Sequence, residues 1–184
     1  MDDREGLPIT LSILLIELAN RLNLPVSGLG LPGHFMAIYR EPLEKKDRKK
    51  RAQSKEILID AFGGKIINRR EASDITGVLL SDLSFEPTSK KDIITRMLRN
   101  LIQSAEREQD QVSKLRYMGA ILAISPNDRY TRAMRAMIHY EREEFDKTLR
   151  DIDFLLLENP ESPENLPLQE IRTRLIERGL IGHQ

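Results

Sequence analysis

The 184-residue sequence contains no cysteine, and its 29 basic residues equal its 29 acidic residues in number. Without cysteine the chain can form neither disulfide bonds nor thiolate metal sites, and such a composition fits a reducing compartment. A formal net charge of zero removes any global attraction to nucleic acid or to an anionic membrane. The sequence therefore excludes a disulfide scaffold and gives no electrostatic sign of a nucleic-acid or membrane partner.

Hydrophobic runs long enough to cross a bilayer are lacking as well. The mostly apolar run at residues 9–16 meets Glu17, which is too soon for a membrane span. The first residues include Asp2 and Asp3, whereas a secretory signal begins with basic residues. We therefore expect a soluble cytoplasmic protein with no membrane partner.

The chain changes character near Pro87. The part before it holds seven of the ten glycines and the alternating apolar pattern of β-strands. Residues 9–22 are apolar on nearly all sides, which predicts a helix buried on most faces. Asn68 and Glu71 match a capping box, which predicts a short helix to about Ile75. The predicted strands are residues 26–29, 35–39 and 56–60, the last one ended by a Gly-Gly pair.

After Pro87 the sequence predicts helices only, with an internal repeat. A shift of 34 residues places Leu115 on Leu149, and the Ser-Pro-Asn-Asp at 125–128 on the Asn-Pro-Glu-Ser at 159–162. A 34-residue helix–turn–helix period is the signature of tetratricopeptide repeats. The expected helices are residues 89–107, 111–124, 128–142, 145–158 and 168–179, the last one a capping helix.

A charged segment at residues 44–51 separates two of the predicted strands. It could serve as a nucleic-acid or phosphate patch, or as a localisation signal. It has no aromatic residue to stack on a base, and the rest of the chain is neutral. The segment is therefore interpreted as a solvated hairpin loop, and a nucleic-acid-associated regulator is kept as the weaker alternative.

His34 and Asp60 stand at the ends of neighbouring predicted strands, with an apolar helix ahead of them. Together they correspond to two members of a Cys-His-Asp nucleophilic site whose thiol is absent from the chain. We expect a ring nitrogen of His34 to lie near hydrogen-bond distance of the Asp60 carboxylate, facing the start of the 9–22 helix. Such a pair could act as a base or only satisfy its two polar groups.

Four segments carry a family resemblance: Gly-Leu-Pro-Ile-Thr-Leu-Ser at 6–12, Arg-Leu-Asn-Leu-Pro at 21–25, Leu-Pro-Gly-His-Phe at 31–35 and Ile-Asp-Ala-Phe-Gly-Gly at 59–64. They resemble the bacterial SirB-type branch of the transglutaminase-like superfamily. In that branch tetratricopeptide-like helices follow the core, and the segment 96–101 is similar to their start. The resemblance implies an α+β fold, with a reduced core of one buried helix and antiparallel strands at residues 1–87 and an all-α helical array at residues 88–184. Relatives carry helical sequence before the first segment, so either this chain is a fragment or its core is shortened there. A missing N-terminal layer would leave the helix partly uncovered.

The resemblance also implies the site. It places the family's catalytic Cys at or next to Pro8, while His34 and Asp60 match the other two positions, so the triad is degenerate. Thr10 and Ser12 lie one turn into the helix and are the substitute nucleophiles to weigh. Hydroxyls on a buried helix more often bond to backbone carbonyls. Because the catalytic Cys is absent, the sequence favours a protein without enzyme activity over an enzyme.

The leading functional prediction is a non-catalytic interaction or regulatory module that binds a protein or peptide through its helical repeats. The alternative is a hydrolase or acyltransferase of the transglutaminase-like class with a nucleophile other than cysteine. No cofactor is predicted, and no metal, because His34 and Asp60 would supply only two ligands. The predicted binding residues are Asn100, Gln103, Arg107, Arg132, Arg135 and His139.

Overall fold

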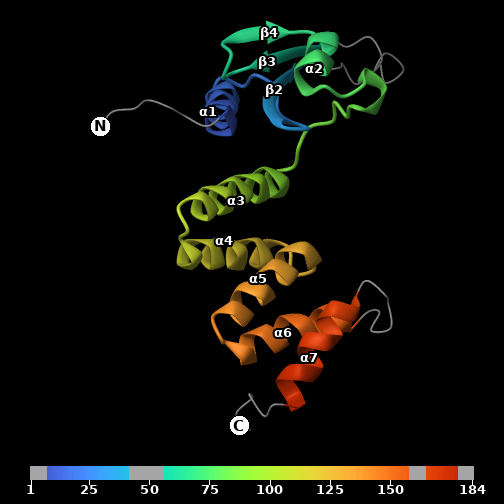
Figure 1. Cartoon of the computed structure of the whole chain (residues 1–184). Coiled ribbons are helices and arrows are strands. Elements are labelled where there is room, and N and C mark those ends of the chain that lie inside the picture. Colours follow the sequence, from blue (N-terminus) through green and yellow to red (C-terminus); the bar gives the residue numbers. More distant parts are fainter. Residues whose placement is uncertain (1–7, 42–55, 158–164, 178–184) are drawn as a thin grey trace. The chain divides into compact units, whose positions relative to one another are not determined.

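A computed structural model describes residues 8–41, 56–157 and 165–177 (Figure 1). Contacts between residues divide the chain into two compact units, Met1–Ile94 and Thr95–Gln184, and each is described by itself. The fold is α+β, as predicted, with an antiparallel sheet in the first unit and helices throughout the second. The charged segment at 44–51 and the second copy of the repeated turn at 159–162 lie outside the described residues.

The sheet of the first unit has the strand order β1-β2-β3-β4, and every neighbouring pair is antiparallel. Three of its strands were predicted to within a few residues. The fourth was missed because the glycine pair before it was read only as the end of a strand. Gly64 has φ +64°, which glycine adopts without strain, so the pair forms a tight turn instead. The strands are β1 (Val26–Leu31), β2 (His34–Arg40), β3 (Glu56–Asp60) and β4 (Lys65–Ile67).

Helix α1 (Pro8–Arg21) packs on one face of this sheet. Its Ala19 forms a cluster with Val26 of β1 and Ala37 of β2. The expected burial on most faces is wrong, because the helix contacts β1 and β2 along one side only. Leu14, Leu18 and Leu22 are 57%, 50% and 70% exposed, which leaves a row of leucines open along its flank.

The opposite face of the sheet is covered by α2 (Arg69–Thr76) and by Leu83 and Phe85, which follow the 3-10 turn η2 (Leu80–Asp82). The predicted capping box at the start of α2 is confirmed. Asn68 accepts a hydrogen bond from the Glu71 amide at 3.0 Å, and the Glu71 carboxylate accepts one from the Asn68 amide at 2.7 Å. The core on this face contains Leu29, Leu31, Met36, Ile38, Leu58, Ile67, Ala72, Leu83 and Phe85.

The outer edge of β1 is occupied by the chain that leads into the next helix. The Thr88 amide donates to the Gly28 carbonyl at 2.8 Å, and the Gly30 amide donates to the Thr88 hydroxyl at 2.7 Å. These bonds satisfy backbone groups that an open edge strand would leave unpaired. The segment around Thr88 therefore belongs to the first unit by its hydrogen bonds.

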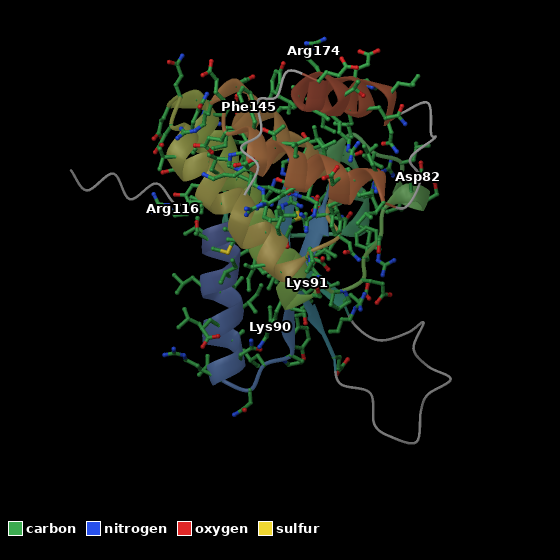
Figure 2. The ribbon with its side chains drawn as sticks, turned by 90° about the horizontal axis from the view of Figure 1, so that it is seen from below. Asp82, Lys90, Lys91, Arg116, Phe145 and Arg174 are labelled. Carbon is green, nitrogen blue, oxygen red and sulfur yellow. The ribbon has the colours of Figure 1, made fainter. Side chains whose placement is uncertain are left out.

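The second unit consists of two helical hairpins and a final helix. Helix α3, which starts at Lys90 and Lys91 (Figure 2), spans the boundary between the two units and is followed by α4 after a short turn. Helix α5 packs against α4 and α6, and α6 also packs against α7. Phe145 at the start of α6 (Figure 2) packs its ring 6.2 Å from that of Tyr140. The elements are α3 (Lys90–Arg107), α4 (Gln111–Ile124), α5 (Arg129–Glu141), α6 (Phe145–Leu156) and α7 (Leu166–Glu177).

The turns inside the two hairpins are alike, 34 positions apart. Gln109 and Glu143 both have positive φ, at 57° and 58°. The next amide in each turn reaches back five residues, from Asp110 to the Ala105 carbonyl at 2.8 Å and from Glu144 to the His139 carbonyl at 2.9 Å. The helix–turn–helix unit thus recurs with the same hydrogen bonds after 34 residues.

Candidate functional site

The two residues expected to form a dyad share a face of the sheet without meeting. Ala37 pairs with Ile59, and the same register sets Asp60 opposite Met36, two residues from His34. Side chains at alternate positions share a face, so both lie on the Met36 side, which is the side of α2 and away from α1. Neither a hydrogen bond nor an ion pair joins His34 to Asp60. The expected bond and the expected approach to the start of α1 are both wrong in this structure.

Asp60 instead closes the turn between β3 and β4. Its Oδ1 accepts a hydrogen bond from the Gly63 amide at 2.8 Å. A Cβ on Gly63 would collide with this same carboxylate, so the close approach requires glycine there. Asx-type bonds of this kind are a common reason for Asp to stand at a turn. The structural interpretation of Asp60 accounts for its contacts without any catalytic partner.

The two hydroxyl candidates on α1 lie in different environments. Ser12 is fully buried, and its Oγ donates to the Phe35 carbonyl of β2 at 3.1 Å. Thr10 lies two residues away, which is about 200° around a helix, and its side chain is exposed. Ser12 therefore acts as a tether between α1 and β2, and its proton is directed at a backbone oxygen rather than at His34.

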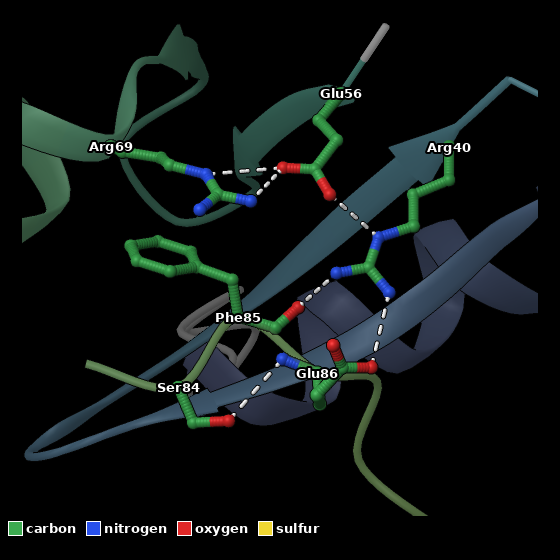
Figure 3. Close-up of polar contacts among 6 residues, drawn as sticks. All are labelled: Arg40, Glu56, Arg69, Ser84, Phe85 and Glu86. Carbon is green, nitrogen blue, oxygen red and sulfur yellow. Dashed lines mark hydrogen bonds and ion pairs between the residues drawn. The ribbon is translucent and has the colours of Figure 1, made fainter. Parts of the chain in front are cut away.

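A charged cluster that the sequence analysis missed holds one end of the sheet together (Figure 3). The Glu56 carboxylate binds Arg40 Nε at 2.9 Å, and its other oxygen forms an ion pair with Arg69 of α2. Arg40 also donates to the Phe85 carbonyl, and the Arg69 guanidinium lies 4.4 Å from the centre of the Phe85 ring. The cluster thus joins β2, β3 and α2 to the segment that follows η2.

The electrostatics of this cluster favour a charged carboxylate. Burial by itself would raise the pKa of Glu56, but the hydrogen bonds and charges of Arg69 and Arg40 outweigh it and lower the pKa. Arg40 and Glu56 are directly paired across β2 and β3, which favours opposite charges. In sequence the two are separated by the charged segment, so only the register of the strands brings them together.

In the second unit, two of the predicted binding residues face inward. Asp151 of α6, which is 2% exposed, accepts hydrogen bonds from Arg132 at 3.0 Å and from Arg135 at 2.7 and 2.6 Å. Arg132 also donates to the Pro126 carbonyl and lies 3.6 Å from the centre of the Phe154 ring. The two arginines neutralise a buried carboxylate between α5 and α6 instead of lying open in a groove.

His139 is likewise engaged within the unit. Only 8% of it is exposed, and its Nδ1 lies 2.6 Å from the Glu144 carboxylate at the start of α6. Glu144 also binds Lys147 at 3.0 Å and Arg142 at 3.1 Å. Hydrogen bonds from Lys147, His139 and Arg142 lower the pKa of Glu144 to about 2. His139 therefore helps to fix the turn between α5 and α6.

The remaining predicted residues lie on α3, and two of them line a groove. Gln103 and Arg107 border a groove of about 860 Å³ within the second unit, whereas Asn100 is not among its lining residues. Tyr130, which is 70% exposed, stands at its edge. Ile102, Met118 and Met134 supply the apolar part of the surface, and Arg99, Glu106, Lys114 and Thr131 complete the lining.

Two ion pairs border this groove. Lys114 is paired with Glu106, and Arg99 is paired with Asp128 at 3.0 Å. The groove thus combines an apolar floor with a charged rim. Within residues 8–41, 56–157 and 165–177, no group of three or more His, Asp or Glu side chains is placed to hold a metal ion.

Comparison with known proteins agrees with the sheet-and-helix architecture of the first unit. A family profile described as the transglutaminase-like superfamily matches residues 1–99. SirB1 of Salmonella typhimurium is 24% identical over 168 residues, covering 87% of this chain and 58% of SirB1. F-box only protein 21 of Homo sapiens is 28% identical over 106 residues, covering 57% of this chain and 16% of that protein. The chain thus spans well under two thirds of the length of these relatives.

No solved structure matches the chain. Among the described helices, none has both the length and the apolar character needed to cross a membrane. The profile covers more than half of the chain, and the SirB1 alignment extends through most of the helical unit. This protein therefore belongs to the transglutaminase-like superfamily. SirB1 is similar to it over most of the length of this chain.

Proposed function

We propose that this protein is a non-catalytic member of the transglutaminase-like superfamily that acts in the cytoplasm as a protein-interaction or regulatory module. The sequence has no cysteine, and the resemblance puts the position of the nucleophile at or next to Pro8. The observation that carries the proposal is the separation of the other two positions. Asp60 bonds to the Gly63 amide and has no bond to His34, so no oriented base exists for a nucleophile to use.

The hydroxyls of α1 support the same proposal. A serine nucleophile needs a base within hydrogen-bond reach, and the Ser12 proton is directed at the Phe35 carbonyl. The side chain of Ser12 is also closed to solvent, so a substrate carbonyl has no path to it. A hydrolase or acyltransferase with a substitute nucleophile would have to rebuild this part of the fold.

We further propose that the helices of the second unit form a short tetratricopeptide-like array that binds a peptide. The recurrence of the Gln109 and Glu143 turns after 34 residues supports the repeat. The groove bordered by Gln103, Arg107 and Tyr130 is the proposed binding surface. With only two hairpins, the affinity should be modest, on the order of micromolar.

The absence of catalysis can be tested on the purified chain. Peptidase, deamidase and transglutaminase substrates should show no turnover above buffer. Turnover that Thr10→Ala or Ser12→Ala abolishes would contradict the proposal. Pro8→Cys adds a thiol at the start of α1, where the helix dipole favours a thiolate. Its alkylation should be insensitive to His34→Ala, because His34 faces the other side of the sheet.

The binding surface can be tested with a pair of charge reversals on exposed arginines. Arg107→Glu changes the groove, whereas Arg150→Glu changes α6 away from every residue that lines it. Proteins captured by the wild-type chain should be lost with Arg107→Glu and kept with Arg150→Glu. Equal capture by both variants would place the interaction elsewhere.

A further inference from the structure

The groove of the second unit carries more positive than negative charge. Its lining includes the cations Arg99, Arg107 and Lys114. Among the described residues of the lining, Glu106 is the only carboxylate, and Asp128, which binds Arg99 at 3.0 Å, is a second one at the border. The whole chain has a net charge of zero, so the excess belongs to this groove and not to the protein as a whole.

Arg107 is the cation of this groove that remains available to a ligand. Arg99 is held by Asp128, whose other oxygen accepts a hydrogen bond from the Thr131 amide at 2.9 Å. Arg107 is exposed, and no described residue forms an ion pair or a hydrogen bond with its side chain. The side-chain amide of Gln103, one turn earlier on α3, is equally unengaged by the described residues. A ligand at this edge therefore meets a guanidinium and an amide with free hydrogen-bond donors.

The ion pair of Lys114 and Glu106 is unequal in its exposure. The side chain of Lys114 is 12% exposed, whereas that of Glu106 is 60% exposed. Lys114 has little water to solvate its charge and so depends on a carboxylate close by. Glu106 can turn into solvent at little cost, because ion pairs with an exposed partner contribute little to stability. A carboxylate of a ligand is therefore able to replace Glu106 beside the Lys114 ammonium.

This ion pair also marks the end of the positive part of the groove. Lys114 and Glu106, together with Met134, line both the groove and a neighbouring cavity of about 540 Å³. Glu141 lines only that neighbouring cavity, where Lys114 is the only basic residue among the described lining. The acidic residues of a ligand thus belong on the Arg107 side of the pair.

The apolar floor of the groove is adaptable in shape. It is formed by half-buried Ile102 and Met134 and by fully buried Met118. The unbranched thioether of methionine adjusts to apolar partners of different shapes. Such a floor accepts several apolar side chains, so charge is left to decide which ligands bind.

We propose that the ligand of this groove is an acidic peptide segment of another protein, an inference that rests on the peptide-binding function proposed above. One carboxylate of the peptide binds the Arg107 guanidinium, and a second one takes the place of Glu106 at Lys114. Large apolar side chains between these acidic residues lie on Ile102 and Met134. Charge-assisted bonds to arginine are strong and directional, so they supply the selectivity that the floor lacks.

Acidic segments of this chain itself fit the groove less well. Residues 158–164 contain three glutamates and two prolines, with no large apolar side chain for the floor. In residues 1–7 a basic residue interrupts the acidic ones, and the two large apolar residues stand at the ends. The other stretches outside the described residues, 42–55 and 178–184, carry a net positive charge. The same four segments are what a second copy would offer, so a different protein is the better source.

The probes are three fluorophore-labelled decapeptides with leucine at positions 4 and 7. Positions 3, 5, 6 and 8 are glutamate in the first, glutamine in the second and lysine in the third, and all other positions are serine. Binding to the full chain is measured by fluorescence anisotropy at one salt concentration. The glutamate peptide should bind about tenfold more tightly than the glutamine peptide, and the lysine peptide more weakly than either.

Two substitutions in the groove should act in opposite directions. Arg107→Gln should weaken binding of the glutamate peptide about tenfold and leave that of the glutamine peptide unchanged. Its matched control is Arg150→Gln, an exposed change on α6 outside the groove lining, which should alter neither. Glu106→Gln should tighten binding of the glutamate peptide roughly threefold, because no carboxylate of the protein then competes for Lys114. Glu108→Gln, on the same helix but outside the lining, should have no such effect.

The possible failures are distinguishable. Circular dichroism should show the same helix content for all variants, as expected for exposed positions. Equal affinities for the three peptides that Tyr130→Ala weakens would overturn the acidic ligand and leave the proposed peptide-binding function standing. Binding of none of the peptides would overturn both. Tighter binding of the glutamate peptide by a chain that combines Asp2→Asn, Asp3→Asn and Glu5→Gln would assign the groove to the chain's own first residues and overturn the proposal.

Discussion

Arg135 of α5 and Asp151 of α6 form a two-bond ion pair, with Nε to Oδ2 at 2.7 Å and a terminal nitrogen to Oδ1 at 2.6 Å. The carboxylate is 2% exposed, and Arg132 approaches it from the preceding turn of the same helix. Bidentate arginine–carboxylate pairs are among the stronger and more directional polar contacts in proteins. The pair fixes how the two helices of the second hairpin pack, so it is a structural element of this unit.

Reversal of the charge at Arg135 should destabilise the helical unit. Arg135→Glu would set a second carboxylate beside buried Asp151, and breaking a buried pair costs about 3–5 kcal/mol. Urea unfolding followed by the helical circular dichroism signal measures the loss. Arg150→Glu, an exposed change of the same charge on α6, should shift the free energy of unfolding by less than about 0.5 kcal/mol. Equal effects of the two variants would contradict the structural role.

Gly28 and Gly119 should respond oppositely to alanine. A Cβ on Gly28 would lie 2.7 Å from Phe35 Cζ and 3.1 Å from Ile93 Cδ1, and Phe35 is buried with little room to move. Gly28→Ala should therefore lower stability by about 1–3 kcal/mol. A Cβ on Gly119 of α4 meets nothing within 4 Å, so Gly119→Ala should raise stability by roughly 0.5–1 kcal/mol. Thermal unfolding of the two variants and the wild type tests this prediction: the melting temperature should fall for Gly28→Ala and rise for Gly119→Ala.

Glu144 should give the protein an acid-sensitive component of stability. Its pKa is lowered from 4.5 to about 2 in the folded state, through hydrogen bonds from Lys147, His139 and Arg142. A lowered folded-state pKa contributes stability that is complete above the unfolded value and is lost as the pH falls from about 4.5 to about 2. The difference in melting temperature between wild type and Glu144→Gln should be constant above about pH 5 and shrink below it. A difference that does not change between pH 7 and pH 3 would contradict the assignment.

Ser12 should matter for stability and not for chemistry. Ser12→Ala leaves the buried Phe35 carbonyl without its hydroxyl donor, at a cost of about 1–3 kcal/mol. Asn20→Ala, an exposed change on the same helix, should have an effect below about 0.5 kcal/mol. Chemical denaturation measures both. A Ser12→Ala variant as stable as wild type would show that the tether is dispensable.

Local sequence was sufficient for most elements of the fold. The alternating apolar residues of β2, the Asn68–Glu71 capping box and the 34-residue recurrence of the helical hairpins are signals carried by neighbours in the chain. The short strand β4 was missed because a Gly-Gly pair can either end a strand or form the turn of a hairpin, and the local sequence is the same in both cases. Only the pairing of Ile66 with Ile59 distinguishes the two.

Tertiary structure decided which polar residues meet. Arg40 and Glu56 lie 16 positions apart, as do Arg135 and Asp151, and no local pattern indicates that either pair is in contact. His34 and Asp60 were matched by position, yet the register puts them two residues apart on the face away from α1. The leucines of α1 predicted burial, but the sheet covers only one side of the helix. Hydrophobic period and turn residues determine which elements form, because they act within a few residues. Register, helix rotation and the number of elements available to cover a face determine the contacts, because they depend on the whole packed unit.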